Sequence, residues 1–209
     1  FSIAISWRWM ISIKSTLIVL HDSILPRYRG FLPLVTQLIE KEKELGVSAI
    51  IASESYDKGD IIYASKITIN YPITIKKAIE KIGSCYIQCL KHILFYIETN
   101  KNFECKKQDE NIATYSLWRD KEDYFINWNW PVEKILRFID ALGFPYEGAK
   151  SFLDDNLVII DKARISKNVF IHNRDVGKII FNKESRPIVV CKDGLLEIVQ
   201  IRNYETKAS

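Results

Sequence analysis

Several residue types and patterns are scarce in this chain, and their scarcity narrows the choice of fold and function. Among 209 residues there are eight glycines, six prolines, four cysteines and one methionine. No glycine-rich phosphate-binding loop occurs, which argues against the common nucleotide-binding fingerprints. The four cysteines are widely separated, as is typical of reduced thiols in a cytoplasmic protein rather than of a disulfide framework. The sequence also lacks internal repeats and low-complexity tracts.

Long uninterrupted apolar runs and a strong charge of one sign are missing as well. Residues 1–20 are hydrophobic but contain Arg8 and Lys14, so they fit neither a spanning helix nor a secretory signal. The net charge of +4 is a mild excess, more typical of a mixed solvated surface than of a dedicated nucleic-acid face. With 47% apolar and 27% charged residues, the composition predicts a soluble globular protein with one core and a small appendage.

Two segments carry the candidate chemistry, and each follows a predicted strand. The apolar run 17–20 leads into His21, and a second strand at 47–52 precedes an acidic turn that contains Asp57. In open α/β sheets, ligand-binding groups sit where strands run out into loops. An imidazole and a carboxylate just past two strand ends suit acid–base chemistry. The structural alternatives are that His21 caps backbone groups and that Asp57 is an Asx-turn residue.

The same two segments carry a resemblance. The stretch HDSILPRYRG (21–30), followed by SYDKGDII (55–62), resembles the folate-dependent formyltransferase family, which includes methionyl-tRNA formyltransferase and the amino-sugar N-formyltransferases. Residues 114–149 resemble the part that follows the catalytic domain in the tRNA and sugar enzymes. The resemblance implies that His21 and Asp57 are catalytic and that no metal takes part. It also implies binding of the co-substrate N10-formyltetrahydrofolate by Ser23, Leu25, Pro26, Gly30, Ser55 and Tyr56.

One position departs from the family pattern. The family motif is Asn-x-His, but Val19 stands two residues before His21. Residues two apart on a strand point to the same face, so Val19 occupies the place of an amide beside the imidazole. A valine cannot donate a hydrogen bond to a developing oxyanion, and losing one such donor costs about 10²–10³ in rate.

The predicted fold is α/β. We expect a partial, N-terminally truncated, Rossmann-like formyltransferase domain with a mostly parallel sheet (1–113), a helical connecting segment (114–150) and a small antiparallel β subdomain (151–209). Strands are predicted at 1–5, 16–20, 47–52, 60–69, 157–160, 177–181, 187–191 and 195–201. Helices are predicted at 33–45, 74–98 and 131–142, with a loop or linker at 99–113. Residues 192–194, Lys-Asp-Gly, predict a hairpin turn.

Three further groups have competing interpretations. Arg27, Tyr28 and Arg29 could bind a phosphate or a folate glutamate, or form a solvated loop. Cys85, Cys89 and His92 share a helix face and could bind zinc, although core packing fits better. An aromatic cluster could stack bases but fits packing of a helix on the terminal sheet better; it comprises Trp128, Trp130, Phe138 and Tyr146. The resemblance also implies a cis Leu25–Pro26 bond.

The resemblance implies formyl transfer from N10-formyltetrahydrofolate to a primary amine, on a nucleotide-linked amino sugar or on methionyl-tRNA. Two alternatives stay open: a formyltetrahydrofolate hydrolase that uses the same pair on water, and a non-catalytic truncated relative. The expected partners are therefore the folate and an amine-bearing small molecule or tRNA. We expect no membrane partner, and a homodimer is left open.

Overall fold

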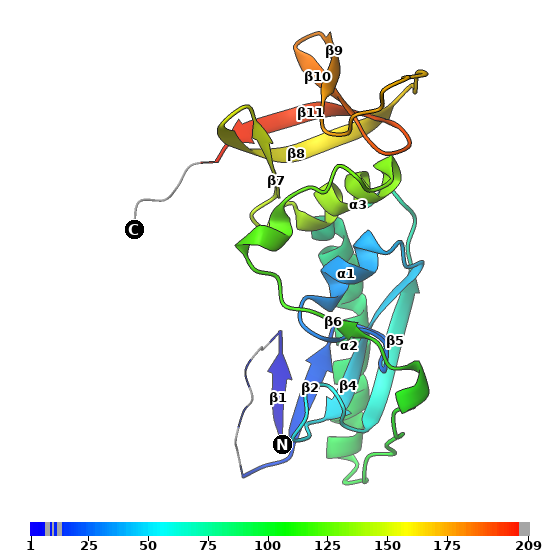
Figure 1. Ribbon diagram of the computed structural model, residues 1–209. Coiled ribbons are helices and arrows are strands. Elements are labelled where there is room, and N and C mark those ends of the chain that lie inside the picture. The colour runs from blue at the N-terminus through cyan, green and yellow to red at the C-terminus, as the bar shows by residue number, and fades with distance from the viewer. Residues whose placement is uncertain (7–8, 10, 12–13, 205–209) are drawn as a thin grey trace. The chain divides into compact units, whose positions relative to one another are not determined.

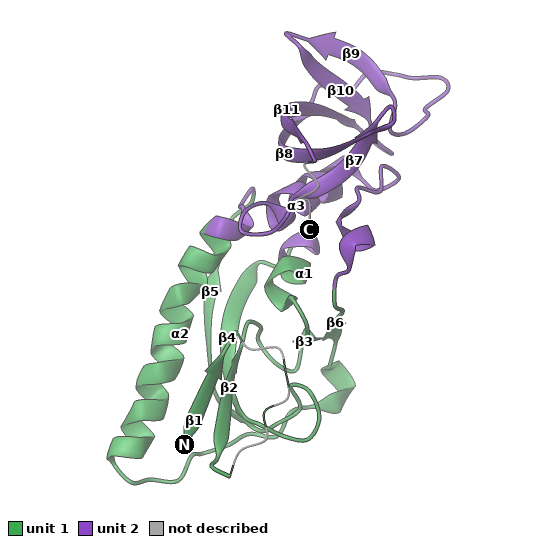
Figure 2. Ribbon diagram, turned by 90° about the vertical axis from the view of Figure 1, so that its left-hand side faces the viewer, with its two compact units in different colours: residues 1–37, 41–71, 77–118 green, residues 38–40, 72–76, 119–209 purple. Residues whose placement is uncertain are grey.

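The structure is a computed structural model that describes residues 1–6, 9, 11 and 14–204, and it divides into two compact units (Figures 1 and 2). Unit 1 comprises Phe1–Gln37, Lys41–Tyr71 and Lys77–Trp118, and unit 2 comprises Leu38–Glu40, Pro72–Lys76 and Arg119–Ser209. The predicted domain boundaries after residues 113 and 150 stay predictions. Within the described ranges, no helix has the length and apolar composition needed to cross a bilayer.

The sheet of unit 1 contains four strands in the order β1 (Ser2–Ile5), β2 (Leu17–His21), β4 (Glu44–Ile51) and β5 (Ile61–Thr68). β1 and β2 are parallel, as expected for a mostly parallel sheet. The β2–β4 and β4–β5 pairs are antiparallel. The predicted α/β class is confirmed, but the described sheet is mixed rather than mostly parallel. The connection 52–60 between β4 and β5 is too short for the crossover that would make these two strands parallel.

The long helix α2 (Ile75–Glu98) runs along this sheet (Figure 1). Its fully buried positions recur every three or four residues, which is the spacing of one helix face: Ile75, Ala78, Ile82, Cys85, Cys89 and Ile93. The Cys89 thiol reaches the Val47 carbonyl of β4, 3.4 Å away. The predicted helix is confirmed. Ile79 is 40% exposed, because it lies one residue beyond Ala78 and turns away from the sheet.

Helix α1 (Pro33–Ile39) is shorter than predicted. The sequence predicted a helix to residue 45, but Lys41 adopts the left-handed conformation with φ of 65°. The Glu42 amide then donates to the Gln37 carbonyl, a bond typical of helix C-termini. Residues from Glu44 onward belong to β4 instead. The alternating charges at 40–44 suited an exposed helix and an entering strand equally well.

Residues 99–118 belong to unit 1. Lys106 exchanges backbone hydrogen bonds with Ile61 of β5. Further on, β6 (Tyr115–Ser116) pairs in parallel with β3 (Arg29–Gly30). The predicted loop or linker at 99–113 is thus a loop of unit 1 that is bound to the loops of the sheet, and it contains one 3-10 turn at Glu110–Ile112.

Unit 2 contains a five-stranded antiparallel sheet and helix α3 (Val132–Leu142). The strand order is β7 (Ala149–Leu153), β8 (Asn156–Ser166), β11 (Leu195–Asn203), β10 (Arg186–Val190) and β9 (Ile179–Lys183). The predicted small β subdomain and the hairpin at 192–194 are confirmed. β7 was not predicted. The apolar face of α3 packs on β7, β8 and β11.

Candidate active site

His21 is the last residue of β2 and its side chain is 7% exposed. Its Nε2 atom lies 2.8 Å from the backbone carbonyl oxygen of Tyr28. A carbonyl oxygen can only accept, so Nε2 carries a proton and the Nδ1 atom is the one whose protonation is open. The loop 22–28 therefore folds back toward the end of β2, where the Tyr28 carbonyl holds the His21 ring in place.

Asp57 lies in the turn between β4 and β5, with a left-handed φ of 55° and a side chain that is 13% exposed. Its Oδ1 atom is 3.4 Å from Nδ1 of His21. The other carboxylate oxygen, Oδ2, accepts the Gly30 amide at 2.8 Å. The structure therefore brings together the two residues that the sequence singled out, from two separate strand ends.

The orientation of the pair has a consequence for its protons. With Nε2 protonated, an unprotonated Nδ1 would direct its lone pair at a carboxylate oxygen, which is repulsive. A proton in the gap between Nδ1 and Oδ1 removes that repulsion. The geometry therefore suits an imidazolium whose two N–H groups face protein acceptors, an arrangement that can supply positive charge near a reacting oxygen.

Two glycines allow the backbone to pack closely in the loops around His21 and Asp57. A Cβ at Gly59 would lie 1.6 Å from the Ile51 carbonyl oxygen, so the turn that carries Asp57 closes only with glycine there. Gly30 has φ of 98°, and a Cβ there would lie 2.6 Å from the Ser116 carbonyl oxygen. Both glycines are direct structural requirements of the His21–Asp57 geometry.

A cavity of about 80 Å³ lies beside Asp57. Asp57 and Val19 both line it, together with Ser55 and Tyr56. The other lining residues are mostly apolar: Ala4, Trp9, Ile11, Leu17, Ile50, Ala52 and Ser53. Val19 thus faces the same space as the carboxylate, at the place where the family motif has an amide.

The remaining predicted folate-binding residues have structural contacts of their own. Ser23 is fully buried, and its hydroxyl donates to the Arg27 carbonyl at 2.6 Å. The Leu25 amide donates to the Ser48 hydroxyl at 3.0 Å. The Leu25–Pro26 bond is cis, as the resemblance implied, and Phe144–Pro145 is a second cis bond that was not predicted. A role of Ser23, Leu25, Pro26 and Gly30 in folate binding stays a prediction.

The residue after His21, Asp22, is half-buried. The Tyr86 hydroxyl of α2 donates to the Asp22 carboxylate, and the Asp22 carbonyl accepts Gln37 Nε2 at 2.7 Å. Burial raises the pKa of Asp22, and it also raises the pKa of Tyr86. Asp22 therefore links the end of β2 to α1 through Gln37 and to α2 through Tyr86. Sequence reasoning did not single it out.

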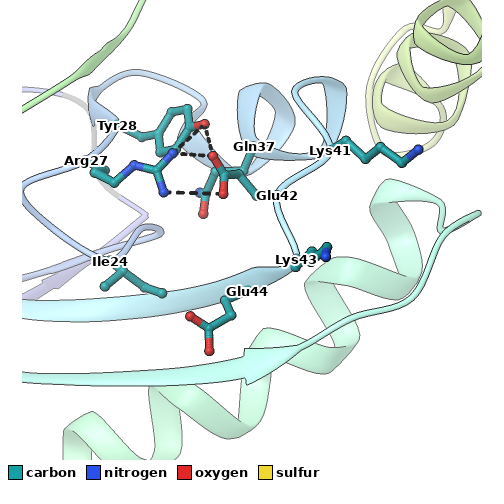
Figure 3. Close-up of a pocket in the computed structure, with 8 residues that line it drawn as sticks. All are labelled: Ile24, Arg27, Tyr28, Gln37, Lys41, Glu42, Lys43 and Glu44. Carbon is teal, nitrogen blue, oxygen red and sulfur yellow. Dashed lines mark hydrogen bonds and ion pairs between the residues drawn. The ribbon is translucent and has the colours of Figure 1, made fainter.

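The basic run 27–29 is engaged with carboxylates. Arg27 and the Tyr28 hydroxyl both donate to Glu42, as Figure 3 shows at a charged cavity of about 320 Å³. Glu42 raises the pKa of Arg27. Arg29 is fully buried, with Nη2 donating to Glu110 at 2.7 Å. These contacts favour a structural role over anion binding. Residues 27–29 are nevertheless less exposed to solvent than the solvated-loop alternative predicted.

The other candidate groups have packing roles. Cys85 and Cys89 are buried free thiols, and the His92 ring stacks on Tyr63 at 4.3 Å. In the described part of the chain, no three potential metal ligands come together, so the zinc interpretation lacks support. Trp130 contacts Phe138 of α3 edge-on, and Trp128 Nε1 donates to Ser151 of β7. That agrees with packing of the helix on the terminal sheet.

The fold and the site define a class: an α/β protein with an imidazole–carboxylate pair at two strand ends, followed by an antiparallel β unit. The formyl transferase family model matches residues 5–86, and the model of the formyl transferase C-terminal domain matches residues 119–209. The chain belongs to the formyl transferase family.

Individual relatives agree with this assignment. Methionyl-tRNA formyltransferase of Dictyoglomus thermophilum is 33% identical over 184 residues, which cover 87% of this chain and 58% of that protein. The structure of HypX from Aquifex aeolicus with tetrahydrofolic acid has a TM-score of 0.73 at 20% identity, and covers 97% of this chain and 36% of HypX.

A third relative is the N-formyltransferase from Helicobacter canadensis, solved with folinic acid and dTDP-3-aminofucose. It has a TM-score of 0.62 at 22% identity, and the match covers 90% of this chain and 66% of that enzyme. The chain thus spans between one third and two thirds of the three relatives.

Proposed function

We propose that this chain carries the acid–base half of a formyltransferase that moves a formyl group from N10-formyltetrahydrofolate to a primary amine. The observation that carries the proposal is the 3.4 Å approach of His21 to Asp57, whose side of the pair lines a mostly apolar cavity. The HypX structure was solved with tetrahydrofolic acid and the Helicobacter canadensis enzyme with folinic acid, which supports a folate co-substrate.

The roles follow from the geometry of the pair. When an amine attacks the formyl carbon, a carbon–nitrogen bond forms and the formyl oxygen becomes an oxyanion. The protonated imidazole of His21 stabilises that oxyanion. The intermediate collapses by breaking the bond between carbon and N10. Asp57 holds the imidazolium and helps to move the proton released by the amine to the departing nitrogen.

The acceptor is a finer part of the proposal. We infer a primary amine on a nucleotide-linked amino sugar or on methionyl-tRNA, because the relatives include a methionyl-tRNA formyltransferase and an enzyme solved with dTDP-3-aminofucose. Ser55 and Tyr56, which line the cavity beside Asp57, contact the folate in this proposal. A cytoplasmic location and a homodimer belong to the same proposal.

Formyl transfer by the full chain and by His21→Ala tests the function. The assay supplies N10-formyltetrahydrofolate with either dTDP-3-aminofucose or methionyl-tRNA. We expect His21→Ala to lower kcat by about 10²–10³, because the oxyanion loses the positive charge that stabilises it. His172→Ala is the matched control, since His172 is exposed in the second unit, and its kcat should equal that of the parent.

Three outcomes contradict the proposal in different ways. Residual activity of His21→Ala above roughly a tenth of the parent value would remove His21 from the mechanism. Formate release by the parent without any amine would identify a hydrolase. Absence of folinic acid binding in calorimetry would indicate a non-catalytic relative, in agreement with Val19 in place of the family's asparagine.

A further inference from the structure

Gln108 contacts the turn that carries Asp57 although it lies 51 positions further along the chain. Its side-chain Nε2 donates to the Asp57 carbonyl oxygen at 2.7 Å and to the Gly59 carbonyl oxygen at 2.7 Å. Both amide hydrogens of Gln108 therefore bind the two ends of a three-residue turn. The carbonyls that they bind are those of the candidate catalytic residue and of the glycine that closes the turn.

Arg29 binds the other end of the same amide. Its Nε and Nη2 atoms lie 3.0 Å and 2.8 Å from Oε1 of Gln108. The side chain of Arg29 is fully buried, and Glu110 accepts from both of its terminal nitrogens. A guanidinium only donates and a carbonyl only accepts, so the orientation of the Gln108 amide is determined by its partners.

The charges strengthen this chain of hydrogen bonds. Glu110 raises the pKa of Arg29, and Arg29 lowers the pKa of Glu110, so the ion pair persists at neutral pH. A cation on Oε1 polarises the amide and makes its hydrogens better donors. The bonds to the Asp57 and Gly59 carbonyls are therefore stronger than those of an isolated glutamine.

The Asp57 turn needs such support. Asp57 is a non-glycine residue in the left-handed region, with φ of 55°. Its carboxylate must also point at His21 with Oδ1 while Oδ2 accepts the Gly30 amide. Fixing the two carbonyls of the turn fixes the direction in which the carboxylate leaves the backbone. Arg29 precedes Gly30, so one short segment contributes to both sides of this arrangement.

We propose that Gln108, oriented by Arg29 and Glu110, is a positioning residue that holds the Asp57 carboxylate in register with His21. The catalytic meaning of this role rests on the proposed function, whereas the positioning itself is independent of it. Gln108 is not itself a lining residue of the cavity, and its hydrogen bonds to the Asp57 turn are made to backbone carbonyls alone.

Hydrogen exchange of the Gly30 amide reports on the position of the carboxylate without any turnover. Gly30 donates to Asp57 Oδ2, so its exchange accelerates when Asp57 leaves. The decisive variant is Gln108→Glu, which keeps an acceptor for Arg29 but has no amide hydrogens for the two carbonyls. We expect the Gly30 amide of Gln108→Glu to exchange at least about tenfold faster than that of the parent at neutral pH.

Two references separate positioning from loss of the fold. Leu25 lies in the loop between His21 and Gly30, and its amide donates to the Ser48 hydroxyl of β4. This amide should keep its parent exchange rate. Gln88→Glu makes the same change at an exposed site of α2, and both amides should be unaffected there. Equal acceleration of Gly30 and Leu25 in Gln108→Glu would mean general destabilisation and would overturn the proposal.

Glu110→Gln gives a second test with little risk to folding, because the Glu110 side chain is 60% exposed. It weakens the hold on Arg29, so Gly30 should exchange at least about twofold faster while Leu25 does not change. Unchanged Gly30 exchange in both variants would also overturn the proposal. A parent chain that transfers no formyl group would remove the function but leave the exchange result, and hence the positioning role, intact.

Discussion

At the scale of single residues, the candidate site consists of the His21–Asp57 pair and of Gln108 and Arg29, which hold the Asp57 turn. His21 and Asp57 stand in short motifs at predicted strand ends, so their meeting could be anticipated. Arg29 and Gln108 could not, because they are 79 positions apart and their hydrogen bond depends on how two irregular segments lie together. Neither residue falls in a periodic pattern, and a buried arginine looks the same in a sequence as a solvated one.

Val19 gives the most direct test of the cavity. Replacing Val19 with asparagine places an amide in the cavity that Asp57 also lines. We expect Val19→Asn to raise kcat by about tenfold or more, because a hydrogen-bond donor then reaches the oxyanion. Val19→Leu is the control, since it adds volume without a donor and should not raise the rate. A neutral result for Val19→Asn would mean that another group already serves this oxyanion.

Asp140 on α3 gives a prediction about pH. Burial raises the pKa of Asp140 to about 6, and attraction to Lys162 offsets part of that rise. A carboxyl whose pKa is higher in the folded state stabilises the fold while it is protonated. Its contribution is complete below the ordinary pKa near 4 and is lost as the pH rises through 6. The free energy of unfolding should therefore fall across this interval.

Asp140→Asn should remove that dependence. We expect the variant to match the parent at pH 4 and to exceed it by about 1–3 kcal/mol at pH 7.5, measured by urea unfolding. Asp155→Asn is the control because Asp155 is exposed in the turn between β7 and β8. An Asp140→Asn variant that gains nothing at pH 7.5 would show that Lys162 or water compensates the buried charge fully.

At the scale of helices and strands, periodicity predicted position better than direction. The spacing of apolar residues located α2 and α3 within one residue at each end. It could not determine that β4 runs antiparallel to β2, since alternation along a strand is the same in both directions. The end of α1 was also missed, because it depends on the left-handed turn at Lys41 rather than on any break in the pattern.

The N-terminus of α3 depends on a residue far away in the sequence. Pro131 precedes the helix and has no side-chain acceptor, and the Val132 amide instead donates to Asp193 Oδ1 at 2.8 Å. We expect Asp193→Ala to lower the free energy of unfolding by about 1 kcal/mol, because it removes both the cap and a negative charge near the helix N-terminus. Asp193→Asn keeps an acceptor and should lose less. Equal losses in urea unfolding would argue against capping.

At the scale of the whole molecule, the sequence correctly predicted an α/β part and a small antiparallel β part. Residues 99–113 were predicted to be a loop or linker, because they are polar and show no periodicity. Those residues belong to unit 1, where Gln108, Glu110 and β6 bind the loops of the sheet. Polarity indicates exposure on average, but it does not reveal which polar side chains have buried partners.

The salt dependence of binding distinguishes the two classes of acceptor. A methionyl-tRNA substrate presents many phosphates, and its affinity should fall steeply with salt as counterions are released. A nucleotide-linked sugar has few phosphates and should show a shallow slope. With a net charge of only +4, we expect the shallow slope for the acceptor that is formylated faster. A steep slope for that acceptor would favour the tRNA assignment.

The attachment of residues 106–116 to the loops that carry Arg29 and Asp57 matters for recombining members of this family. A chimera that switches parents at residue 99 would take Arg29 from one protein and Gln108 with Glu110 from another. Switching after Trp118 keeps those three side chains, and the β3–β6 pair, from a single parent. Exchange of the C-terminal portion should therefore tolerate sequence divergence far better at the later junction.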